Sequence, residues 1–94
     1  MVAAIGVAWY RHEDYPQILK MMSDADLFPA TYHAWRAQAL DSEQMLERRG
    51  YKVVRVYIDP DRFPAWCFKR GLALDANARS QFASYFMMRR TKRS

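Results

Sequence analysis

The pattern of hydrophobic and polar positions predicts two strands. A continuous apolar run over Val2–Trp9 is typical of a strand that is buried on both faces. A second strand is expected over Tyr51–Ile58, where Val54, Val56 and Ile58 point to one side and more polar side chains point to the other. The connection between the strands, roughly 40 residues, is long enough for a crossover, which favours parallel pairing.

Apolar positions at helical spacing predict four helices in the rest of the chain. The expected ranges are about Tyr15–Met22, Tyr32–Arg49, Arg62–Arg70 and Ala76–Arg89. A residue suited to cap a helix N-terminus precedes each of them, namely Asp14, Thr31, Asp61 and Asp75. Gly50 and Gly71 follow the second and third helices, where a residue in the left-handed conformation ends many helices.

The predicted order of elements is strand, helix, helix, strand, helix, helix, which indicates an α/β fold. A chain of 94 residues forms one domain, and we expect it to cover residues 1–88, with residues 89–94 as a basic tail. Two strands make a marginal sheet unless helices cover it or another chain extends it. The shortage of strands therefore favours a partner, most simply a second copy of this chain.

The positive charge is concentrated at the C-terminus. The net charge is +5, and Arg89, Arg90, Lys92 and Arg93 supply four of these units. Residues 1–88 hold 11 basic and 10 acidic side chains, so the body of the protein is nearly neutral. One interpretation is a tail that contacts phosphate groups or anionic lipid, and the alternative, which we favour, is a solvated chain end.

Cysteine content and hydropathy indicate a cytoplasmic protein. The single cysteine, Cys67, allows no disulfide within the chain, which fits a reducing compartment. The apolar run over Val2–Trp9 is too short to span a membrane and lacks the basic start of a signal peptide. We therefore expect no targeting segment and no interaction with a membrane.

No motif predicts a metal, a nucleotide or a nucleophile. His12, His33 and Cys67 lack the paired spacing of metal ligands. Cys67 shares a helical stripe with Phe63 and Trp66, where a buried and inert thiol is usual. The three glycines are isolated, so there is no phosphate-binding loop. We expect no cofactor, and the sequence favours a protein that is not an enzyme.

The best small polar cluster lies at the ends of the two predicted strands. His12, Glu13 and Asp14 follow the first strand, and Asp59 and Asp61 follow the second. If the strands are parallel, these side chains share the edge at which open α/β sheets place ligand sites. The residues then form a site for a small ligand or for catalysis. The alternative, which we favour, is that Asp14 and Asp61 cap helices and the other charges are solvated.

The segment Arg62–Arg89 has the outline of a helix-turn-helix unit, which suggests nucleic-acid binding. The residues that we expect to contact nucleic acid lie on the last helix and in the tail: Asn77, Arg79, Gln81, Arg89, Arg90, Lys92 and Arg93. The five-residue connection over 71–75 is long for the tight form of this motif. The aromatic residues of the last helix also count against it.

Three stretches, Gly6–Tyr15, Leu27–Trp35 and Tyr57–Cys67, give the chain a resemblance to a group of small, uncharacterised bacterial proteins. The resemblance covers most of the chain. It implies a bacterial, cytoplasmic setting. The group has no assigned activity, so the resemblance implies no site residues.

These observations favour a non-enzymatic protein-interaction module that forms a homodimer or binds a protein partner. The hydrophobic fraction of 51% and aromatic fraction of 15% exclude a disordered chain and leave aromatic helix faces for such contacts. One alternative is nucleic-acid binding through the last two helices and the basic tail. The other is a small-ligand or enzymatic site near His12–Asp14 and Asp59–Asp61.

Overall fold

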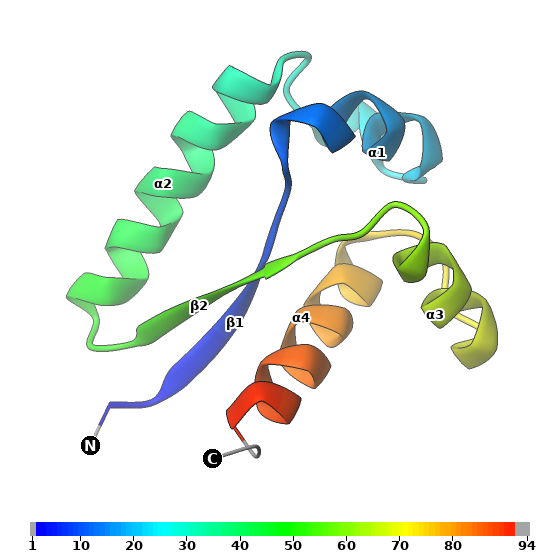
Figure 1. Ribbon diagram of the computed structural model, residues 1–94. Helices are drawn as coiled ribbons and strands as arrows, with labels where there is room; N and C mark the ends of the chain where they lie inside the picture. The colour runs from blue at the N-terminus through cyan, green and yellow to red at the C-terminus, as the bar shows by residue number, and fades with distance from the viewer. Residues whose placement is uncertain (1, 92–94) are drawn as a thin grey trace.

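The computed structural model describes residues 2–91 and shows an α/β fold (Figure 1). The elements are, in order, β1 (Ala4–Trp9), α1 (Tyr15–Met21), α2 (Tyr32–Arg48), β2 (Lys52–Tyr57), α3 (Arg62–Arg70) and α4 (Ala76–Thr91). Short 3₁₀ turns, His12–Asp14 and Ala25–Leu27, flank α1. Both predicted strands and all four predicted helices are confirmed. Because α4 continues to Thr91, Arg89 and Arg90 belong to that helix.

The two strands pair in parallel, as predicted. Ala4 lies opposite Lys52 at one end of the ladder and Trp9 lies opposite Tyr57 at the other. Figure 1 shows α2 and α4 on opposite sides of this sheet, and α1 and α3 beyond the carboxyl ends of the strands. Within residues 2–91 the sheet has these two strands alone, so each strand has one edge with no neighbouring strand.

Helix α4 packs closely against β1 because residue 6 is glycine. A Cβ atom at Gly6 would lie 2.6 Å from the carbonyl oxygen of Ala83 and 2.9 Å from Cβ of Met87. Both distances are shorter than van der Waals contact, and the first is to backbone, which cannot rotate away. The missing side chain therefore sets the distance between β1 and α4.

The burial of β1 differs from the prediction of a strand that is buried on both faces. Trp9 is buried, but Ala4 is exposed and the four residues between them are half-buried. The core instead lies around the carboxyl ends of the strands, where Ile18, Ile58 and Phe63 are fully buried. A sheet of two strands is too narrow for its helices to enclose it completely, so an apolar strand stays partly open.

Two of the four predicted N-terminal caps and both predicted C-terminal glycines are confirmed. Oγ1 of Thr31 accepts a hydrogen bond from the backbone N–H of Ala34 (3.1 Å), and Oδ1 of Asp75 accepts one from that of Ala78 (3.0 Å). Gly50 and Gly71 have φ values of 94° and 65°, as their positions after helices predict.

Two predicted caps are wrong. The side chains of Asp14 and Asp61 make no capping hydrogen bond. A 3₁₀ turn runs directly into α1, so Asp14 already has helical backbone angles. At α3, Oδ1 of Asp59 instead accepts hydrogen bonds from the backbone N–H groups of Asp61 (2.8 Å) and Arg62 (3.0 Å). These bonds hold the pKa of Asp59 below its ordinary value.

Candidate functional site

A groove lined by basic and aromatic side chains lies between α3 and α4. Its volume is about 540 Å³. The residues that line it are Arg62, Ala65, Trp66, Lys69, Arg70, Phe82, Tyr85, Phe86 and Arg89. We refer to it below as the α3–α4 groove.

Helical periodicity brings these residues together. On α3, Arg62, Trp66 and Arg70 are spaced four residues apart and therefore follow one face of the helix. The other face of α3 carries Phe63 and Cys67, which are buried in the core. On α4 the lining positions 82, 85, 86 and 89 also repeat at intervals of three and four residues. Two amphipathic helices thus turn their mixed aromatic and basic faces toward the same hollow.

The guanidinium groups of the groove lie against aromatic rings. The Arg70 guanidinium carbon is 4.2 Å from the ring centre of Trp66 and 5.2 Å from that of Tyr85. On α4, Nη1 of Arg89 donates a hydrogen bond to the Tyr85 hydroxyl at 3.0 Å. At exposed sites each cation–π contact of this kind contributes about 0.5–1 kcal/mol. The cations are therefore oriented, but weakly held.

Among the residues that the structure describes, no acidic one lines the groove. Its four cationic side chains, Arg62, Lys69, Arg70 and Arg89, are all exposed. Within the described part of the chain, no carboxylate forms an ion pair with any of them. The local charge is therefore strongly positive although the body of the protein is nearly neutral, and the aromatic rings lower the hydration of the same surface. This combination suits a flat or extended anion.

A second, smaller hollow of about 210 Å³ continues the groove toward β2. It shares Arg62, Phe82 and Phe86 with the α3–α4 groove and adds Arg11, whose guanidinium lies 4.6 Å from the ring centre of Tyr57. Asp59 is the one acidic residue among the described residues of its lining, and its carboxylate accepts hydrogen bonds from the backbone N–H groups of Asp61 and Arg62. The basic surface thus runs from Arg89 past Arg62 to Arg11.

The predicted ligand edge at the strand ends is divided between two regions. The ring of His12 stacks on that of Tyr32, with ring centres 4.8 Å apart, and lines a hollow of about 200 Å³ beside α1. Asp59 lines the different hollow described above. Among residues 2–91, no group of three or more His, Cys, Asp or Glu side chains is placed to hold a metal ion.

The acidic members of that edge serve local contacts instead. Asp14 lies 4.0 Å from Arg11 across one turn, and Glu13 and Asp61 are exposed. Parallel pairing brings the strand ends together, but His12 turns toward the start of α2 while Asp59 turns toward the start of α3.

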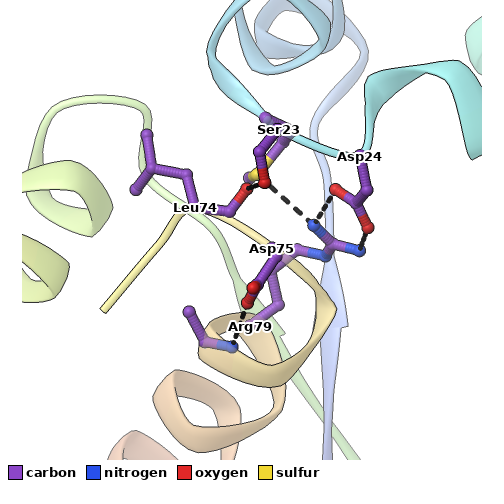
Figure 2. Close-up of polar contacts among 7 residues, drawn as sticks. Ser23, Asp24, Leu74, Asp75 and Arg79 are labelled. Carbon is purple, nitrogen blue, oxygen red and sulfur yellow. Dashed lines mark hydrogen bonds and ion pairs between the residues drawn. The ribbon is translucent and has the colours of Figure 1, made fainter.

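Arg79, a predicted nucleic-acid contact, is bound within the fold. Figure 2 shows its guanidinium against the carboxylate of Asp24, which accepts hydrogen bonds of 2.9 and 2.8 Å from the two terminal nitrogens. The Arg79 side chain is 11% exposed. Hydrogen bonding by Arg79 holds the pKa of Asp24 below its ordinary value. Arg79 therefore connects the segment after α1 to α4.

The other predicted nucleic-acid contacts are distributed along α4 and beyond it. Asn77 and Gln81 are exposed in the first half of the helix, outside the lining of the groove. Arg89 lies in the groove. The structure describes Arg90 only as part of the α4 backbone, and Lys92 and Arg93 lie outside the described residues.

Cys67 is a core residue, as the sequence predicts. It is 1% exposed, and burial raises the pKa of its thiol. A buried thiol with a raised pKa is a poor nucleophile, so Cys67 has a packing role beside Phe63.

The sequence also contained the signal for the α3–α4 groove. Phe82, Tyr85 and Phe86 lie at helical spacing on one stripe of the last helix, and aromatic helix faces were expected to make protein contacts. In the structure Phe82 is buried and Tyr85 is 37% exposed. An arginine or lysine one turn away from an aromatic residue on both helices was the missed indication of an open, charged face.

Comparison with protein-family models, with curated proteins and with solved structures finds no match to this chain. The resemblance to a group of small bacterial proteins stays a prediction. None of the helices in the described residues combines the length and apolar character that are needed to cross a membrane.

Proposed function

We propose that this protein binds nucleic acid through the α3–α4 groove. The observation that carries the proposal is the composition of the groove: four cationic side chains and four aromatic rings, with no carboxylate among the described residues that line it. Arginine and lysine neutralise phosphates and release their counterions, which supplies most of the affinity of sequence-independent binding. Aromatic rings on the same surface offer stacking partners to bases.

The proposal differs from helix-turn-helix recognition. A recognition helix directs side chains of its first turns to base edges. In α4, Arg79 belongs to that part of the helix and is paired with Asp24. The proposed contact surface instead follows the second half of α4 and the facing side of α3. The sequence beyond Thr91 adds Lys92 and Arg93 to the same end of the chain.

Salt dependence of binding tests this proposal. The probes are a fluorescein-labelled 20-nucleotide strand of mixed sequence and its duplex, and the measurement is fluorescence anisotropy between 50 and 300 mM NaCl. The variant is Lys69→Ala/Arg70→Ala, which removes two of the groove cations. We expect affinity to fall steeply with salt, and the slope of log Kd against log salt to decrease by about 1.4 for the single strand in the variant.

The matched control is Arg48→Ala/Arg49→Ala. It removes the same charge from an adjacent basic pair that is exposed at the end of α2. This control should keep the salt slope of the unmodified protein. Absence of binding at 50 mM NaCl, or equal slopes for the two double variants, contradicts the proposal.

Homodimerisation is the second candidate, favoured by the unpaired sheet edges. Among the described residues each strand lacks a neighbour on one side, and the apolar β1 is only half-buried over most of its length. A second copy, or a strand of a protein partner, would cover this surface. Sedimentation velocity up to high micromolar concentration tests it, and a monomer throughout excludes the dimer. A cytoplasmic location fits both candidates and stays a prediction.

A further inference from the structure

We infer that the ligand of the α3–α4 groove is single-stranded nucleic acid, and that a base takes the place of the Arg70 guanidinium on the indole of Trp66. This inference rests on the proposed function and adds which form of nucleic acid is bound, and how. It identifies Trp66 as the stacking residue and Arg70 as the residue that moves from the ring to a phosphate.

Trp66 contacts both the core and the groove. Its ring packs against Phe82, with ring centres 5.3 Å apart, and it also lines the groove. The indole Nε1 has less than 1 Å² of accessible surface, and no acceptor for its proton is found among the described residues. A buried donor without an acceptor is unfavourable, and native structures rarely leave one.

Arg70 covers the ring but is weakly held there. Its guanidinium lies over the ring of Trp66 and near that of Tyr85, and Nη1 donates a long hydrogen bond, 3.4 Å, to the backbone oxygen of Trp66. The residue is exposed, and no carboxylate in the described chain pairs with it. A phosphate offers the same group charge-assisted and bidentate hydrogen bonds, which are stronger than its present contacts.

The guanidinium of Arg70 lies over one face of the Trp66 ring, at 4.2 Å from its centre, and a flat base can stack on the same face. Base stacking on an aromatic side chain stabilises more than the cation–π contact that it replaces at an exposed site. The groove volume of about 540 Å³ lies within the range of sites that hold small organic molecules, so a base and its sugar can enter.

The same geometry disfavours a duplex. In a duplex the faces of the bases are stacked on one another, and only their edges are accessible in the grooves. The α3–α4 groove presents ring faces, such as that of Trp66, which stacked bases cannot reach. Single strands offer unstacked bases to such a surface.

The test compares a 12-nucleotide thymidine strand with a DNA hairpin of the same phosphate count. Titration into ¹⁵N-labelled protein is followed through the indole N–H resonances of its three tryptophans, assigned with Trp→Phe variants. Trp9 and Trp35 serve as internal controls because they pack against each other on the α2 side of the sheet. We expect the single strand to move the Trp66 resonance alone, and to bind at least tenfold more tightly than the hairpin.

Two variants separate stacking from charge. Trp66→Leu removes the ring and should weaken single-strand binding about tenfold with no change in salt slope. Trp66→Phe keeps a ring and should retain most of the affinity. If Trp66→Leu does not fold, the resonances of the unmodified protein still decide the question.

The outcomes distinguish this inference from the proposed function. Equal binding of strand and hairpin, with a steep salt slope and an unmoved Trp66 resonance, overturns base stacking but supports nucleic-acid binding. Absence of binding to either probe contradicts both. Tight single-strand binding that moves the Trp66 resonance supports both.

Discussion

Two groups of arginines in this protein differ in whether a carboxylate pairs with the guanidinium. Arg55 and Arg79 each form a bidentate pair with a carboxylate, Glu43 and Asp24 respectively, at 2.7 to 2.9 Å. The arginines of the groove, Arg62, Arg70 and Arg89, lie over aromatic rings and form no ion pair with a carboxylate of the described residues. The first group connects parts of the fold. The second is available to an external anion.

Net charge alone does not distinguish these two groups. Counting basic residues assigned most of the net charge to the C-terminal tail. The structure shows a third location, the groove, where four exposed cations form no ion pair with a carboxylate of the described residues. Substitutions can test this distinction, first in stability and then in binding by the groove.

The largest effect is expected from breaking the Asp24–Arg79 pair. Asp24→Ala leaves the guanidinium of Arg79 in a largely buried position without its partner, which should lower the free energy of unfolding by about 3 kcal/mol. Urea denaturation followed by circular dichroism measures it. Asp26→Ala, at an exposed acidic residue two positions away, is the control and should change stability by less than about 0.5 kcal/mol. Equal effects of the two substitutions would refute the structural role of the pair.

The second prediction concerns how the stabilisation by the Asp24–Arg79 pair depends on pH. Because hydrogen bonding by Arg79 lowers the pKa of Asp24 in the folded state, its stabilising contribution is complete above the ordinary value of 3.8. It is lost as the pH falls through the lowered pKa. The stability difference between the unmodified protein and Asp24→Ala should therefore be constant from pH 7 to pH 5 and shrink below pH 4. Denaturation curves at these pH values measure the difference. If it were the same below pH 4 as at pH 7, the pair would not have this role.

A smaller effect is expected at the second carboxylate pair. Arg55 lies over the ring of Trp9 at 3.9 Å and is 35% exposed, so solvent screens its interaction with Glu43. Glu43→Gln should lower the free energy of unfolding by about 1 kcal/mol, measured in the same urea experiment. Glu47→Gln, one turn later on the exposed side of α2, is the control. If Glu43→Gln lowered the free energy of unfolding as much as Asp24→Ala does, the difference in burial between the two pairs would not matter for stability.

The smallest effect on stability is expected in the groove itself. Lys69→Ala/Arg70→Ala removes cations that have ring contacts or solvent as neighbours, so the free energy of unfolding should change by less than about 0.5 kcal/mol. The same variant should show the reduced salt slope of nucleic-acid binding. If this variant lost as much stability as Asp24→Ala, Lys69 and Arg70 would have a structural role like that of Arg55 and Arg79. The two groups would then not differ in function.

Much of the fold could be predicted from local sequence. Strands and helices follow from periodicity, and the caps at Thr31 and Asp75 follow from the chemistry of single side chains. The caps predicted at Asp14 and Asp61 failed because other local geometries competed. A 3₁₀ turn precedes α1, and Asp59 reaches across Pro60 to the first N–H groups of α3. Helix starts with several neighbouring acids are thus ambiguous in a sequence.

The site was less predictable because it depends on pairings between distant segments. Arg79 and Asp24 are 55 residues apart, and nothing near Arg79 indicates that its charge is used in the fold. The aromatic stripe on α4 identified a face, but periodicity does not say which neighbouring element covers that face or how completely. Here α3 covers Phe82 and leaves Tyr85 partly open. The groove depends on how α3 and α4 pack against each other, and no single stretch of the sequence specifies that packing.

The glycine at position 6 has a consequence for the groove, although it lies on the opposite side of α4. Ala83 and Met87, which approach Gly6, alternate along α4 with the groove residues Tyr85 and Arg89. A side chain at position 6 would push α4 outward and carry its aromatic face with it. The position of the groove-lining side of α4 thus depends on the opposite side of the helix, where residue 6 has no side chain. A substitution at residue 6 should therefore change the α3–α4 groove as well as the packing of α4 on β1.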